Sequence, residues 1–130
     1  MVAFIFSIRA WSILPSMKKF LQGLGYAFAG LGIAWKEEAN FRIQVVMTLL
    51  VVAFGWYVRL TSVEWMFVAL SIAFVLSAEA FNTAIEELGD LHETNHNPRV
   101  ARLKDLSAAA VLLASLGALA VGLIVFLPHL

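Results

Sequence analysis

The sequence has no cysteine, which excludes disulfide bonds and metal sites built from thiolates. Charged residues make up only 14% of the 130 residues and sum to a net charge of zero, so the chain has no overall attraction to nucleic acid. The glycines between residues 23 and 32 are not followed by the Lys-Ser/Thr pair of a phosphate-binding loop. A nucleotide-binding site in this chain would therefore be of neither the P-loop nor the protein-kinase type.

Hydrophobic residues, in contrast, are abundant. They make up 62% of the chain, and the mean hydropathy is +0.87. A soluble domain of this size would expose too much apolar surface to stay dispersed in water. Apolar runs at about 43–58, 65–88 and 106–127 suit helices that cross roughly 30 Å of hydrocarbon, the shortest by using the residues before it. The sequence predicts one small all-α membrane domain, with residues 89–103 as its long polar loop.

The part before the first span is amphipathic. Within residues 17–37, apolar side chains recur at helical spacing, at Phe20, Leu24, Phe28, Leu31 and Trp35. Charged residues lie at both ends, which predicts an N-terminal helix in the membrane interface. Residues 1–16 are apolar but short and lack the features of a signal peptide. Because Met17 reads as a natural start, we interpret residues 1–16 as a leader or mis-started segment and residues 17–130 as the domain.

The distribution of lysine and arginine predicts the orientation of the spans. Before the first span lie Arg9, Lys18, Lys19, Lys36 and Arg42, and around the loop between the second and third spans lie Arg99, Arg102 and Lys104. The opposite side has only Arg59. The positive-inside rule therefore predicts a cytoplasmic N-terminus and a C-terminus outside.

Polar residues form a stripe at the cytoplasmic end of the second span. At about 100° per residue, four side chains fall on one helix face: Glu79, Asn82, Glu86 and Asp90. Carboxylates inside a span are unfavourable by roughly 2.5–3.5 kcal/mol each on insertion scales. The chemistry that suits such a stripe is binding Mg²⁺ and accepting a proton.

Other elements bring charged residues to the same depth. Glu38 precedes the first span, and with Glu86 it suits a magnesium ion that carries a nucleotide. Glu79, one turn deeper, would accept the proton of a lipid hydroxyl. The cations that could neutralise phosphate charge are Lys104, Arg102 and Lys19. Tyr26 is either an interfacial aromatic residue or a stacking partner for a nucleotide.

Two other classes of function stay open from the residues alone. Intramembrane carboxylates also mark proton or ion pathways, although here the polar residues do not continue through the other spans. A small membrane scaffold subunit would explain the ridge of small residues on the third span, Ala110, Ala114, Ala118 and Gly122, which lets another helix approach closely. A scaffold would not explain the polar stripe.

The motif E-x-x-N-T-A-I-E from Glu79 to Glu86, with Asp90 and then Lys104-Asp105 downstream, resembles the small prokaryotic diacylglycerol kinases, a family that includes undecaprenol kinases. The resemblance extends from about Lys18 to the C-terminus. It implies Glu79 as catalytic base, and Glu38 and Glu86 as ligands of the Mg²⁺ bound to ATP. It also implies nucleotide contacts from Lys19, Tyr26, Lys104 and Asp105, and supporting polar roles for Asn82 and Asp90.

The resemblance further implies a homotrimer in the bacterial cytoplasmic membrane that phosphorylates a lipid alcohol, with sites at subunit interfaces. The edges at 63–66 and 124–128 look more like the undecaprenol kinase branch, so undecaprenol is slightly favoured over diacylglycerol as the substrate. Residues 1–16 have no counterpart in the family pattern.

Overall fold

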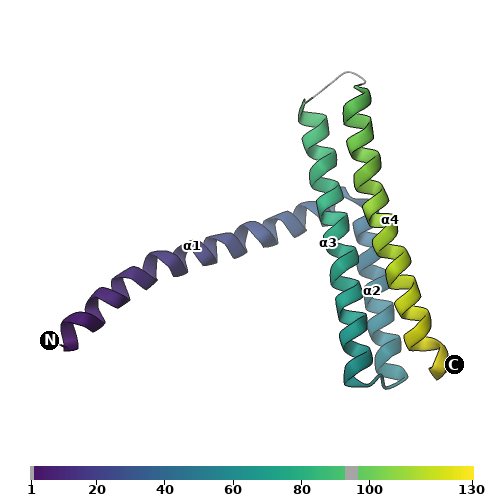
Figure 1. Ribbon diagram of the computed structural model, residues 1–130, viewed down its shortest axis with the longest axis horizontal. Helices are drawn as coiled ribbons and strands as arrows, with labels where there is room; N and C mark the ends of the chain where they lie inside the picture. Colours follow the sequence, from purple (N-terminus) through teal and green to yellow (C-terminus); the bar gives the residue numbers. More distant parts are fainter. Residues whose placement is uncertain (1, 93–96) are drawn as a thin grey trace. The chain divides into compact units, whose positions relative to one another are not determined.

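The computed structural model describes residues 2–92 and 97–130, with side chains over residues 17–91 and 97–130. The described chain is helical, with α1 at Val2–Glu37, α2 at Ala39–Tyr57, α3 at Ser62–His92, α4 at Pro98–Phe126 and a short 3₁₀ helix at Leu127–His129 (Figure 1). It forms two compact units, residues 1–36 and 37–130. Three helices, α2, α3 and α4, are long and apolar enough to cross a membrane, which confirms the predicted all-α membrane class.

The first unit is the single helix α1. A helix covers residues 17–37 as predicted, but it begins much earlier, at Val2, and continues unbroken through Pro15 and Met17. The backbone therefore marks no boundary between residues 1–16 and the rest. Within this unit Phe20 is 66% and Phe28 is 71% exposed, so the apolar face of α1 is not covered by the helix's own residues.

The helices on either side of the expected polar loop, α3 and α4, both extend further into it than predicted. Instead of a loop over 89–103, α3 continues to His92 and α4 begins at Pro98. The Asn-Pro pair starts a helix because proline fits the first helical position, where no N–H partner is needed. The side chain of Asn97 caps this end by accepting a hydrogen bond from the backbone N–H of Arg99 at 2.9 Å. The first span likewise begins early, at Ala39.

A tight turn joins α2 to α3. The N–H of Leu60 donates to the carbonyl of Gly55 at 3.1 Å, and Arg59 takes a left-handed conformation with φ of 58°, as in a Schellman motif. The next helix begins with a capping box: the N–H of Thr61 donates to Glu64 Oε2 at 2.7 Å, and the N–H of Glu64 donates to Thr61 Oγ1 at 3.4 Å. These local contacts hold α2 and α3 antiparallel.

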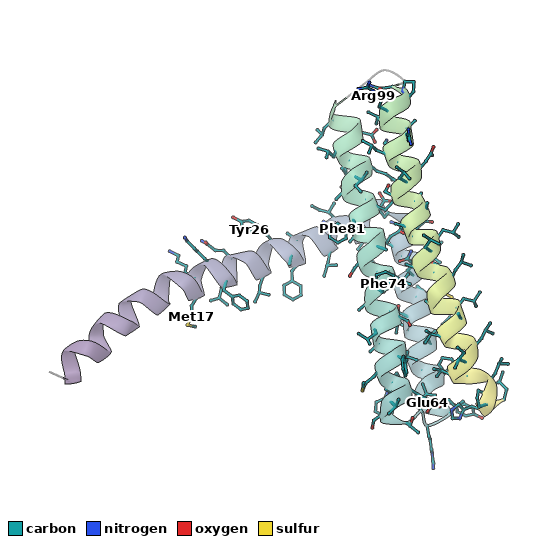
Figure 2. All side chains as sticks on the ribbon, viewed as in Figure 1. Met17, Tyr26, Glu64, Phe74, Phe81 and Arg99 are labelled. Carbon is teal, nitrogen blue, oxygen red and sulfur yellow. The ribbon has the colours of Figure 1, made fainter. Side chains whose placement is uncertain are left out.

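Within the second unit, α4 packs mainly against α3. On the small-residue ridge, Ala114 is 2% exposed and is covered within the chain, whereas Ala110 is exposed and Ala118 and Gly122 line a cavity. A hydrophobic cluster of Leu60, Val68 and Val125 closes the end near the α2–α3 turn. Large apolar side chains elsewhere face outward, and Phe74 and Phe81 on α3 are 67% and 72% exposed (Figure 2). Such a surface is suited to lipid.

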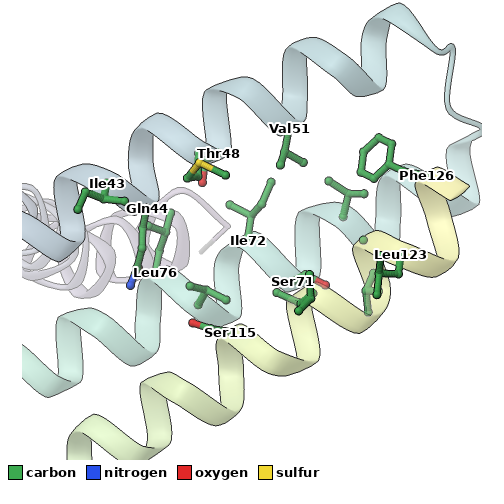
Figure 3. A pocket seen from close by; sticks show the side chains of 17 residues that line it. Ile43, Gln44, Thr48, Val51, Ser71, Ile72, Leu76, Ser115, Leu123 and Phe126 are labelled. Atoms are coloured by element: carbon green, nitrogen blue, oxygen red, sulfur yellow. The ribbon is translucent and has the colours of Figure 1, made fainter. Parts of the chain in front are cut away.

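Between α2, α3 and α4 lies an apolar cavity of about 430 Å³. Polar atoms in its lining come from a few side chains, Gln44, Thr48, Ser71 and Ser115 (Figure 3). Gln44 lies at the end of the cavity lining that is nearest the start of α2.

The helix lengths determine where the polar stripe lies. At a rise of about 1.5 Å per residue, α2 is about 28 Å long, whereas α3 and α4 are each more than about 40 Å. Figure 1 shows α3 and α4 extending beyond the first residues of α2. The polar residues of α3 are therefore distributed from the level of α2 to beyond its end.

Candidate active site

Glu79 is the most deeply buried large side chain among the described residues, with 2% exposure. Its carboxylate oxygen Oε2 accepts a hydrogen bond of 2.9 Å from the side-chain Nε2 of Gln44 on α2. Its backbone carbonyl accepts from the hydroxyl of Thr83, one turn later on α3. The carboxylate predicted to be the base thus lies between two helices, with one oxygen held by an amide.

A second set of contacts joins α3 to α4 one turn further along. Asn82 Nδ2 donates to Glu86 Oε1 at 2.8 Å, and the hydroxyl of Ser107 donates to Asn82 Oδ1 at 2.7 Å. Asn82 and Ser107 are both buried, at 8% and 7% exposure. Because the amide of Asn82 is held on both sides, it determines the orientation of the Glu86 carboxylate and leaves Glu86 Oε2 available.

The outermost member of the stripe is ion-paired. Lys104 Nζ lies 2.5 Å from Asp90 Oδ1, and the Asp90 side chain is largely exposed. The two helices are close here because α3 has a glycine: a Cβ on Gly89 would lie 3.0 Å from side-chain carbons of both Lys104 and Val100. Gly89 therefore permits α4 to hold Lys104 beside the stripe.

Glu38 is half-buried at the N-terminal end of α2, where it has no side-chain capping bond. Burial and the nearby carboxylates of Glu86 and Glu79, with smaller effects from Glu37 and Glu87, raise the pKa of the Glu38 carboxyl above its usual range. Burial is the largest cause of this shift, and the carboxylates of Glu86 and Glu79 on α3 add to it. A cation placed among these groups would relieve the repulsion.

Several predicted site residues lie at exposed positions within their own units. Lys19 and Tyr26 belong to the unit formed by residues 1–36, and both are exposed there. Arg102 and Asp105 lie on exposed positions of α4. Over residues 17–91 and 97–130, no three carboxylate or histidine side chains come close enough to form a ready metal site.

The contacts also identify residues that the sequence argument did not single out. Gln44 bonds to Glu79, and Ser107 bonds to Asn82. Signals for both were present: Gln44 is the amide in an otherwise apolar first span, and Ser107 lies three residues after Lys104, facing the same side of its helix.

Comparison with known proteins gives consistent matches. A family model described as prokaryotic diacylglycerol kinase matches residues 25–126. An undecaprenol kinase of Bacillus subtilis is 32% identical over 114 residues, covering 88% of this chain and 93% of its own. A diacylglycerol kinase of Synechocystis is 33% identical over 123 residues, covering 94% of this chain and 69% of its own. A diacylglycerol kinase of Escherichia coli is 30% identical over 111 residues, covering 85% and 91%.

The Synechocystis match bears on the N-terminal segment. An alignment that covers 94% of this chain leaves about 6% of it outside, which is fewer than 16 residues, so it reaches into residues 1–16. The family model, in contrast, begins at residue 25. That residues 1–16 are dispensable stays a prediction.

Proposed function

Because this chain belongs to the prokaryotic diacylglycerol kinase family, whose members are lipid kinases, we propose that it transfers the γ-phosphate of ATP to the hydroxyl of a membrane lipid alcohol with Glu79 as the base. Family membership also decides between the open classes of function, in favour of a lipid kinase over an ion pathway or a scaffold. The observation that carries the assignment of the base is the buried Glu79 carboxylate, which has one oxygen bonded to Gln44.

In the proposed reaction, the lipid hydroxyl gives its proton to Glu79 as its oxygen attacks the γ-phosphorus. The new O–P bond forms as the bond from the γ-phosphorus to the bridging oxygen of ADP breaks, and ADP leaves with that electron pair. A carboxylate at the depth of Glu79 suits a lipid alcohol. The hydroxyl group of such a substrate stays in the membrane, and its hydrocarbon chain lies among apolar helices. Because Glu79 is buried, its carboxylate is shielded from water and stays free to accept the proton of the lipid hydroxyl.

We assign Glu38 and Glu86 to the Mg²⁺ that accompanies ATP. Carboxylate oxygens are the donors that Mg²⁺ prefers, and Glu86 is near enough to Glu38 to add to the rise that burial causes in the pKa of Glu38. Asn82 and Ser107 would keep Glu86 oriented toward the ion. When bound, Mg²⁺ would neutralise charge on the phosphates and help to orient them.

The remaining polar residues would bind the nucleotide. Lys104, held by Asp90, offers an ammonium group next to the stripe, and its charge suits phosphate oxygens. Arg102 and Asp105 lie on the same end of α4. We assign further nucleotide contacts on α1 to Lys19 and Tyr26. These nucleotide-binding assignments are based on the resemblance to the family motif and not on contacts observed within one chain.

We also propose the finer properties that the resemblance implies: a homotrimer with composite sites, and a cytoplasmic active site in a bacterial inner membrane with the C-terminus outside. Undecaprenol is slightly favoured as substrate over diacylglycerol. Relatives of both names match this chain at 30–33% identity, so the preference rests on the edge segments at 63–66 and 124–128.

The test is phosphorylation by the purified protein in detergent micelles with Mg-ATP and either a short-chain diacylglycerol or an isoprenol. We expect labelled lipid phosphate from at least one, with the isoprenol turned over faster. Glu79→Gln should abolish turnover because the amide keeps the shape but cannot accept the proton. Glu64→Gln, the same change at the other end of α3, serves as the control and should stay active. Failure of the wild type on both lipids would refute the function, and normal turnover by Glu79→Gln would refute the base.

A further inference from the structure

The amide of Gln44 is held in one orientation by chemistry. To act as the proposed base, Glu79 must carry an ionised carboxylate, which can only accept hydrogen bonds, so the NH₂ group of Gln44 faces Glu79, with Nε2 2.9 Å from Oε2. The other end of the amide, Gln44 Oε1, is then buried and has no hydrogen-bond partner within the described part of the chain. A buried acceptor without a partner is unfavourable and calls for an explanation.

The surroundings give no packing reason for an amide here. Ile43 and Leu76, which line the cavity with Gln44, are apolar, and Thr48 lies one turn further along α2 (Figure 3). An apolar side chain of the same length would fill this space without an unpaired oxygen. Within the described residues, the hydrogen bond of the Gln44 side chain goes to the carboxylate of Glu79.

We propose that Gln44 is a positioning residue for Glu79, an inference that depends on the proposed function. Its NH₂ group holds Oε2, so the carboxylate cannot rotate freely and Oε1 is the oxygen presented to the lipid hydroxyl. In the proposed arrangement the Gln44 side chain binds Glu79 and is assigned no contact with the phosphates or the metal. Its removal should therefore slow the proton transfer while the binding of both substrates is kept.

The experiment compares Gln44→Met with a matched control in the assay described above. Methionine keeps the length of glutamine and removes the donor, whereas Thr48→Val alters another polar cavity side chain one turn deeper on the same face of α2. We expect kcat of Gln44→Met to fall about 10- to 100-fold, the range of one hydrogen bond to a charged group. The KM values for lipid and Mg-ATP should stay within about twofold, and Thr48→Val should behave as the wild type.

A double-variant cycle separates positioning from general disturbance of the fold. Glu79→Asp withdraws the carboxylate by one methylene and breaks its bond to Gln44. If Gln44 acts through that bond, adding Gln44→Met to Glu79→Asp should lower kcat by less than twofold further.

Several outcomes would overturn the inference. One is a wild-type kcat in Gln44→Met, and another is an equal loss in Gln44→Met and Thr48→Val. A loss that appears in KM would assign Gln44 to binding instead. An inactive wild-type protein would refute the proposed function itself, which keeps the two failures distinguishable.

Discussion

Ser107→Ala tests whether the contact between α4 and Asn82 maintains the metal-binding end of the stripe. The hydroxyl of Ser107 donates to Asn82 Oδ1 at 2.7 Å, and both residues are buried. Deleting the hydroxyl leaves that oxygen without its donor, which should lower the free energy of unfolding by about 1–3 kcal/mol. Asn82 would then hold Glu86 less firmly, and we expect the KM for Mg-ATP to rise about tenfold, equivalent to about 1.4 kcal/mol.

The assay pairs kinase kinetics with unfolding in mixed micelles, and Ser115→Ala is the matched control. Ser115 lies two turns deeper on α4 and lines the cavity, so its variant removes the same hydroxyl from the same helix. We expect kcat of Ser107→Ala to change little, because Glu79 keeps its own contact to Gln44. Equal stability and equal KM in the two variants would refute the reasoning that α4 orients Glu86.

Three further predictions concern the metal, the packing and the N-terminus. Glu38→Ala and Glu86→Ala should each raise the Mg-ATP requirement steeply, with non-additive effects; losses that simply multiply would argue for separate sites. Gly55→Ala should lower the unfolding free energy by about 1–3 kcal/mol, because a Cβ there would lie 2.9 Å from two packed side chains; an unchanged unfolding curve would contradict this. Deleting residues 1–16 should leave activity nearly unchanged, whereas deleting 1–35 should abolish it; equal loss in membranes would show that residues 1–16 are functional.

The position of each polar residue along its helix could be predicted from the sequence. A spacing of 3, 7 and 11 residues after Glu79 aligns Asn82, Glu86 and Asp90 on any regular helix, whatever it packs against. The stripe does face the neighbouring helices, with Glu79 bonded to α2 and Asp90 paired with α4. The burial of Glu79 was thus implied by its place in an apolar run.

The ends of the helices were harder to predict. Residues 89–103 are polar, and polarity in a membrane protein suggests a loop. The helices nevertheless extend over most of this range, because water satisfies polar side chains equally well on a helix and in a loop. The capping contact of Asn97 determines where α4 begins.

What the sequence alone determined is the class of protein, the number of apolar spans and the register of the stripe, because composition and helical periodicity are local properties of the chain. The partners of the stripe were decided only by the tertiary structure. Gln44 and Glu79 are 35 residues apart and Ser107 and Asn82 are 25 apart, and no local pattern specifies which faces of two distant helices meet. Packing of α4 against α3, permitted by Gly89 and Ala114, turned a row of polar side chains into an ordered network.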